Sequence, residues 1–134
     1  MRRHTRSLLT RVATFLAVGL VALTLAGCGR GSDDEVHDFF SDIAKGARSD
    51  AAARFSPGLH ARFSEDALLV ALDHWSNDIA SHGGLKDIAM SGGVITYNQL
   101  AMYDVVLTYR DGKTKALKTT LVYDEKGWYI NTAL

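Results

Sequence analysis

Asp104 is an acidic residue within a segment, Met102 to Arg110, whose apolar side chains recur at every second position. This period of two is typical of a β-strand with one buried face. If Asp104 lay on the buried face, its desolvated carboxylate could act as a general base. If the alternate face with Tyr103, Val105 and Leu107 is buried, the carboxylate is solvated. We favour the second arrangement, and Asp104 remains the catalytic candidate.

His74, Asp78 and His82 recur every four residues, so they lie along one side of a predicted helix. Imidazole and carboxylate groups at this spacing can share a zinc ion. The apolar stripe of the same helix places His74 almost opposite the core, with Asp78 and His82 on the flank. We therefore expect a solvated surface here, with these residues as the metal-ligand candidates.

Asp33, Asp34 and Glu35 form an acidic run that could contact calcium. Calcium loops of known type also contain a glycine that turns the chain around the ion, and this run has none. Carboxylates stabilise the positive end of a helix. We expect these three to cap a helix, and we expect no cofactor.

Tyrosine and tryptophan are concentrated in the second half of the chain. These side chains are enriched at binding surfaces, but they also pack well in strands and cores, and we expect packing to account for most of them. The candidates for ligand contact are Tyr103, Tyr109 and Trp128. The full set is Tyr97, Tyr103, Tyr109, Tyr123, Trp128 and Tyr129.

Three helices are predicted between Ser32 and His82. A capping box of Ser32 with Glu35 begins the first, a short second helix covers Asp50 to Phe55, and Pro57-Gly58 marks a turn. Ser64 caps the third helix, which Gly83-Gly84 ends. The apolar stripes are Val36, Phe39, Phe40 and Ile43 in the first helix, and Leu68, Leu72, Trp75 and Ile79 in the third.

Antiparallel strands are predicted after Gly84. The first runs from Leu85 to Met90, with a possible continuation over Val94 to Tyr97 after a bulge or bend at Gly92-Gly93. Asp111-Gly112 joins Met102–Arg110 to Thr114–Tyr123 in a hairpin, and Trp128–Thr132 closes the sheet. The fold class is therefore α+β, with N-terminal helices packed on a curved antiparallel sheet.

The first 27 residues have the features of a signal peptide. Four arginines precede a run of about 14 mostly apolar residues, Val12 to Leu25. A bilayer-spanning helix needs about 20 apolar residues, so a permanent anchor fits less well. We expect a signal peptide over 1–27, a tether over 28–34 and one domain over 35–134.

Leu25-Ala26-Gly27-Cys28 resembles the bacterial lipobox, and Cys28 is the only cysteine in the chain. The resemblance implies cleavage before Cys28 and acyl chains attached to its sulfur and amino group. Such chains hold a protein on a membrane, which implies an envelope protein facing the periplasm. Gly29, in place of an aspartate, favours the outer membrane. A conventional signal peptide that leaves a free thiol, or an uncleaved anchor, is the alternative.

Removal of residues 1–27 leaves 11 basic and 15 acidic side chains, a formal net charge of −4. Nucleic-acid binding calls for clustered lysine and arginine, so this class of partner is excluded. The expected partners are the membrane, through Cys28, and an envelope protein or a small apolar ligand.

The order of segments resembles the cystatin-like cone fold of nuclear transport factor 2 and ketosteroid isomerase, and more closely an uncharacterised family of small bacterial lipoproteins with that fold. The resemblance is carried by Val36 with Phe39-Phe40, by HGGLKDI (82–88), by VVLTYRDG (105–112) and by KGWYI (126–130). It implies a domain that can enclose a pocket and can form a homodimer. We expect a non-catalytic binding protein; the alternative is an isomerase- or hydratase-like enzyme with an acid–base residue inside the cone.

Overall fold

The computed structural model of the protein describes residues 30–97 and 99–132. The predicted signal peptide and Cys28 therefore lie outside the described residues. Four helices are followed by four strands: α2 (Ser32–Ala44), α3 (Arg48–Ala53), α4 (Pro57–Arg62), α5 (Glu65–Ser81), β1 (Leu85–Thr96), β2 (Leu100–Tyr109), β3 (Thr114–Asp124) and β4 (Gly127–Ile130). Within these ranges, none of the helices has the length and apolar character that a membrane crossing requires.

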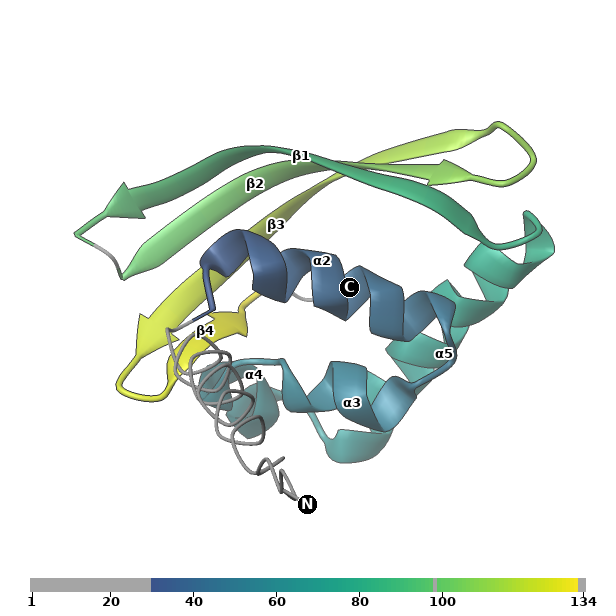
Figure 1. The fold of residues 1–134 in the computed structure, drawn as a ribbon. Helices are drawn as coiled ribbons and strands as arrows, with labels where there is room; N and C mark the ends of the chain where they lie inside the picture. Colours follow the sequence, from purple (N-terminus) through teal and green to yellow (C-terminus); the bar gives the residue numbers. More distant parts are fainter. Residues whose placement is uncertain (1–29, 98, 133–134) are drawn as a thin grey trace, which may run out of the picture.

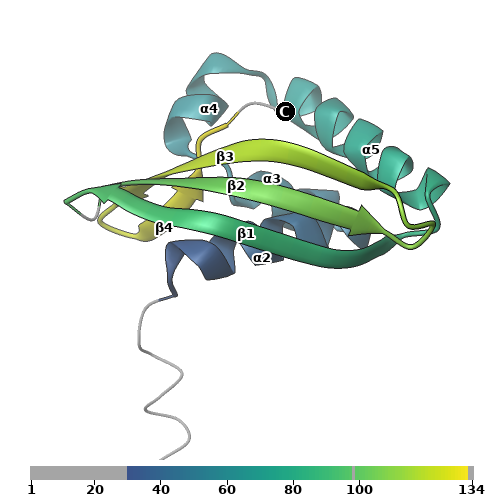
Figure 2. The same cartoon turned by 90° about the horizontal axis from the view of Figure 1, so that it is seen from above.

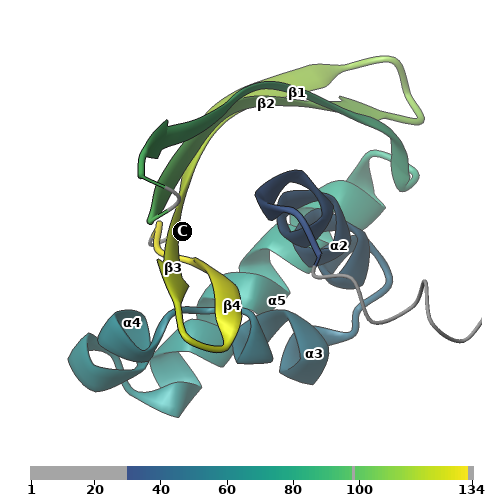
Figure 3. The ribbon, with the colours of Figure 1, turned by 60° about the vertical axis from the view of Figure 1, so that its left-hand side comes forward.

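The strands form one antiparallel sheet in the order β1-β2-β3-β4. The sheet is strongly curved, and the helices lie on its concave side, with α2 against β1 and β4 (Figure 1, Figure 3). Seen from above, the strands lie side by side across the helices, and the outer face of the sheet carries no helix from the described part of the chain (Figure 2). The predicted α+β class is confirmed.

The core lies between α2 and the concave face. The stripe predicted for α2 is fully buried there, with Phe39 and Phe40 in edge-to-face contact at 5.2 Å between ring centroids. From the sheet, alternate residues of β2 point inward, as the period of two predicts. The inward side chains of β2 and β3 are Ala101, Tyr103, Val105, Leu107, Tyr109, Thr119 and Leu121.

Two helix starts match the residue chemistry in different ways. Ser64 caps α5 as predicted, because its Oγ accepts a hydrogen bond from the backbone N–H of Ala67 at 3.1 Å. The prediction for Ser32 is wrong: Gly31 is the N-cap, and the Asp34 carboxylate accepts from the Gly31 N–H at 3.3 Å. The helix thus begins at Ser32, inside the segment predicted to be a tether.

The turn predicted at Pro57-Gly58 is also wrong, because these residues begin α4. Ser56 caps this helix through the Leu59 N–H at 3.2 Å, and proline is well suited to the first helical position because no N–H is needed there. The preceding helix, α3, covers Arg48–Ala53 and begins two residues before the predicted start.

β1 runs without interruption through Gly92 and Gly93, which pair with Tyr103 and Met102 in regular register. Of the alternatives predicted at these glycines, a bulge or turn is not found; the register shifts lie between Leu85 and Asp87 and between Val94 and Thr96. Gly92 has φ +115°, and a Cβ at this position would overlap the Met102 carbonyl oxygen of the neighbouring strand. Glycine is therefore required by the close approach of the two backbones.

Candidate functional site

The inside of the curved sheet is filled by side chains rather than by a cavity. Phe39, Phe40 and Ile43 occupy it from α2, against Val105 and Leu107 of β2. Asp104 lies on the outer face, where its side chain is 67% exposed and 3.9 Å from the Lys118 ammonium. A general base of the predicted kind needs a desolvated carboxylate inside the cone, and Asp104 does not meet this condition.

Tyr103 and Tyr109, two of the three ligand-contact candidates, are core residues with their hydroxyl groups paired. The Tyr103 hydroxyl hydrogen-bonds the Ser32 hydroxyl at 2.6 Å, and the Tyr109 hydroxyl donates to the Asp78 carboxylate at 2.9 Å. Burial, together with Asp78, raises the pKa of Tyr109 to about 12. These hydroxyl groups support the fold and do not face an open site.

The three metal-ligand candidates are not brought together. His74 is exposed, whereas Asp78 and His82 lie at the end of α5 with 3.9 Å between Asp78 Oδ1 and His82 Nε2. His82 Nδ1 lies 2.6 Å from Asp111 of the β2–β3 turn, and the imidazole stacks on the Tyr109 ring at 4.4 Å. Within residues 30–97 and 99–132, no three His, Cys, Asp or Glu side chains are arranged to hold a metal ion.

The contact of His82 with Asp111 joins the end of α5 to the β2–β3 turn. The hydrogen bond from His82 lowers the pKa of Asp111, helped by the backbone N–H of Lys113. The turn also makes two backbone hydrogen bonds to this helix end, from Arg110 N–H to Gly84 O and from Asp111 N–H to His82 O. This end of the domain is therefore held by a polar network.

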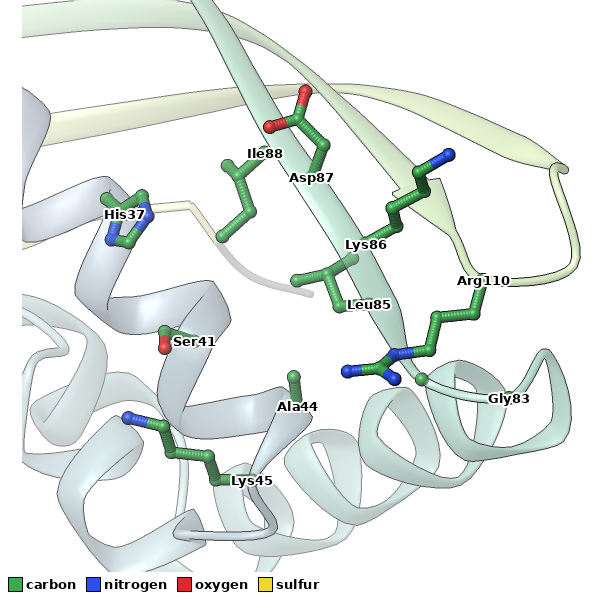
Figure 4. A pocket seen from close by; sticks show the side chains of 11 residues that line it. His37, Ser41, Ala44, Lys45, Gly83, Leu85, Lys86, Asp87, Ile88 and Arg110 are labelled. Atoms are coloured by element: carbon green, nitrogen blue, oxygen red, sulfur yellow. The ribbon is translucent and has the colours of Figure 1, made fainter.

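A groove of about 440 Å³ opens beside this network, between α2 and the first residues of β1. Its volume falls in the range of small-molecule sites. His37, Ser41 and Ala44 face it from α2, and Leu85 and Ile88 face it from β1 (Figure 4). Its other lining residues are Lys45, Gly83, Gly84, Lys86, Asp87 and Arg110.

Arg110, Lys45, Lys86 and Asp87 are the charged residues that line the groove. Arg110 is the one that reaches furthest between the helix and the strand. Its guanidinium extends from the end of β2 into the gap between Ala44 and Gly83, whereas the Lys86 side chain extends away from α2 (Figure 4). The Arg110 side chain crosses Gly84, where a Cβ would lie 3.3 Å from Arg110 Nε. In the described part of the chain, no ion pair is formed by Arg110. A guanidinium without a carboxylate partner is suited to bind an anion.

A second hollow, also of about 440 Å³, lies at the opposite end of the sheet. Trp128, the third ligand-contact candidate, lines it next to Tyr123, with 5.2 Å between the two rings. Arg30, the first described residue, lies on its rim. The remaining lining residues are Glu35, Glu125, Lys126, Gly127 and Tyr129.

Sequence reasoning missed both the groove and the ion pairs of Arg54. The Arg54 guanidinium bonds Glu35 and Asp42 of α2 at 2.8 Å each, and its side chain is only 21% exposed. Burial alone would lower the pKa of Arg54, but these hydrogen bonds outweigh burial and the pKa is raised. The spacing of Glu35, Asp38 and Asp42 at i, i+3 and i+7 was the available signal, since it places three carboxylates on one helix face.

Comparison with known proteins identifies the fold. No protein-family model matches the sequence, and no curated protein matches it. Among solved structures, a "Putative NTF2-like transpeptidase" from Campylobacter jejuni is similar, with a TM-score of 0.66 and 14% sequence identity over 75% of this chain and 97% of that chain. The domain therefore has the fold of nuclear transport factor 2-like proteins, as the order of its segments predicted.

Proposed function

We propose that the protein is a lipid-anchored component of the bacterial cell envelope and that its domain binds a small ligand in the groove between α2 and β1. The ligand has an apolar body with an anionic end, and it is bound without chemical change. The observation that carries the proposal is the filled interior of the cone: with Phe39, Phe40 and Leu107 packed inside, the space for a ligand lies at the rim.

The chemistry of the groove supports this class of ligand. Leu85 and Ile88 supply apolar surface, and the Arg110 guanidinium stands at one end of it. Arginine binds carboxylate and phosphate groups through two parallel hydrogen bonds. The groove is lined by Arg110, Lys45 and Lys86 against the single carboxylate of Asp87. Since the chain from Cys28 onward carries a formal net charge of −4, this excess of cations is a local exception that favours an anionic ligand.

Lipid anchoring is supported by the sequence Leu25-Ala26-Gly27-Cys28. Intact-mass analysis of the exported protein is expected to give a chain that begins at Cys28 and carries acyl groups. The variant Cys28→Ser is expected to lose membrane association. An exported chain with an unmodified sulfur would overturn the anchoring.

Ligand binding is tested by titrating the chain with decanoate and with decanol, which differ in the anionic end. Decanoate is expected to bind more tightly, and Arg110→Gln is expected to weaken it roughly ten- to hundredfold, the value of a charged hydrogen bond. Lys118→Gln is the matched control, because Lys118 lies on the outer face and is 75% exposed. Equal affinity for decanol and decanoate, or an equal effect of both variants, would contradict the proposal.

An isomerase- or hydratase-like enzyme is the second candidate. It is favoured by one observation: His37 and Ser41, four residues apart on α2, both line the groove, opposite Asp87 of β1. The described residues show no hydrogen bond between His37 and Ser41. Catalysis would be favoured over simple binding if the protein converts a bound compound and His37→Gln still binds the compound but no longer converts it.

A further inference from the structure

Large apolar side chains are exposed at one end of the sheet. Tyr97, in the β1–β2 turn, is 95% exposed, and Ile95 just before it is 56% exposed. Tyr123, at the end of β3, is 47% exposed. We call Val94, Ile95, Tyr97, Tyr123 and Trp128 together the aromatic edge. Exposed apolar side chains that gather at one end of a domain are candidates for contact with another apolar phase.

The members of the aromatic edge come from two turns that the backbone holds at the same end of the sheet. The Tyr123 N–H donates to Gln99 O at 2.9 Å, which joins β3 to the β1–β2 turn. Trp128 follows through its contact with the Tyr123 ring. The edge therefore extends from the β1–β2 turn to the β3–β4 turn, both of which lie on the left of the molecule in Figure 1.

The start of the domain lies beside the aromatic edge. Arg30 shares the second hollow with Tyr123 and Trp128. Arg30 is two positions after Cys28 in the sequence, and two residues span at most about 7 Å. An acyl group on Cys28 would therefore hold this end of the sheet close to the lipid surface.

We propose that the aromatic edge is seated in the headgroup region of the membrane and fixes the orientation of the domain. This proposal rests on the proposed lipidation of Cys28. Tyrosine and tryptophan favour the membrane–water interface, because their rings are apolar and their polar atoms stay hydrated. Amphipathic helices at this interface are buried about 5–10 Å into the headgroup boundary, and we expect the side chains of the edge to reach a similar depth. Seated in this way, the edge turns the groove at the other end of the sheet away from the membrane.

The charges around the edge specify the lipid. Arg30 forms an ion pair with Asp38 of α2, and Lys126 lines the hollow together with Glu125. Asp33 and Asp34 are exposed nearby on α2. Acidic side chains at this end give no attraction to anionic headgroups. The contact therefore depends on apolar area, and it is expected to be as strong on zwitterionic phosphatidylethanolamine as on mixtures that contain phosphatidylglycerol.

The chain contains two tryptophans, Trp75 and Trp128, and they allow a matched experiment on the lipidated protein. In Trp75→Phe the tryptophan fluorescence comes from Trp128 alone. In Trp128→Phe it comes from Trp75 alone. Each protein is reconstituted in phosphatidylethanolamine vesicles that contain brominated acyl chains. We expect the lipid to quench Trp128 fluorescence and to leave Trp75, which packs on Phe40 of the core, unquenched.

Ile95→Ser with Tyr97→Ser tests the role of the edge itself. Both side chains are exposed, so the fold is expected to persist. In the Trp75→Phe background these changes are expected to reduce Trp128 quenching to the level of Trp75. Cosedimentation of every variant with vesicles separates the two proposals: failure to cosediment would contradict lipidation. Full cosedimentation with equal quenching of the two tryptophans would overturn the seated aromatic edge and leave lipidation standing.

Discussion

The two ends of the sheet differ in how their side chains are satisfied. At the end near Arg30, apolar rings such as Tyr97 face solvent without a cover from the described residues. At the other end, polar groups pair with one another: His82 with Asp111, and Tyr109 with Asp78. At the first end, exposed apolar side chains have no apolar partner among the described residues. At the second end, the polar side chains named here are paired, whereas Arg110 forms no ion pair with a described residue.

This difference gives each end a separate role. If Cys28 is lipidated as proposed, contact with lipid would stabilise the exposed aromatic edge, because burial of apolar area is favourable by about 25 cal/mol per Å². The polar network also fixes the backbone of Arg110, whose N–H donates to Gly84 O at 2.9 Å, beside the groove in which we propose that an anionic ligand binds.

The largest effect is expected from Gly92→Ala, in the half of β1 nearer to the aromatic edge. The added Cβ would overlap the Met102 carbonyl oxygen, and φ at +115° is unfavourable for alanine. The expected loss in the free energy of unfolding is about 3 kcal/mol or more.

Gly112→Ala, in the turn at the polar end, is the control. Its φ is +89° but no atom lies within 4 Å of the new Cβ, so the loss is expected to be about 1–2 kcal/mol. Urea denaturation followed by circular dichroism measures both. An equal loss in the two variants would show that the close approach of β1 and β2 at Gly92 does not determine the cost of the substitution.

A smaller effect is expected from Arg54→Ala, which removes the ion pairs that Arg54 makes with α2. The variant leaves Glu35 and Asp42 without their shared cation, and two charged hydrogen bonds of 2.8 Å are lost. We expect a loss of about 2–3 kcal/mol.

Arg48→Ala is the matched control, because the Arg48–Asp73 pair is about half exposed and such pairs contribute about 0–1 kcal/mol. Denaturation curves for the two variants compare them directly. A stability change as small for Arg54→Ala as for Arg48→Ala would mean that α2 is held by apolar packing alone.

The smallest effect is expected from Tyr109→Phe, at the polar end, and it depends on pH. The pKa of Tyr109 is about 12 in the folded protein and about 10 in an unfolded chain. Its contribution to stability is therefore complete below pH 10 and is lost as the pH rises from 10 toward 12. Tyr109→Phe is expected to lower the free energy of unfolding by about 1 kcal/mol at neutral pH. At alkaline pH the difference in stability between the variant and the unaltered protein is expected to become smaller.

The alkaline titration is followed by absorbance at 295 nm in the unaltered protein and in Tyr109→Phe. The variant is expected to lack a tyrosine that ionises near pH 12. Retention of that late titration in Tyr109→Phe would contradict the assignment to Tyr109.

The features predicted from sequence are those set by local periodicity. The stripe of α2, the cap of α5 at Ser64 and the hairpin at Asp111-Gly112 follow from residue spacing alone. The predictions for Ser32 and Pro57 are wrong because each residue type fits two local structures. Serine can cap a helix or lie inside it, and Ser32 lies inside α2, where its hydroxyl pairs with Tyr103. Proline can lie in a turn or at the first position of a helix, and Pro57 begins α4 after the Ser56 cap.

The candidate sites were less predictable, because they depend on contacts between segments distant in sequence. Arg110 and Ala44 face the same groove across 66 residues of sequence, and Asp111 meets His82 across 29. The pairing of strands that unites Tyr123 with the β1–β2 turn likewise has no local signal. The alternation around Asp104, by contrast, indicated its outward direction from sequence alone.

The central claim is that the two ends of the sheet differ in their distance from the membrane. It is tested most directly with spin labels at Gln99→Cys and Lys113→Cys, in separate lipidated chains reconstituted in phosphatidylethanolamine vesicles. These positions flank the two ends of β2, which has 10 residues and so spans about 33 Å. A label on Gln99→Cys should collide more with oxygen dissolved in the lipid than with a water-soluble nickel chelate, and a label on Lys113→Cys should do the reverse. Equal collision with the nickel chelate at both positions, in chains that carry the lipid, would contradict the account.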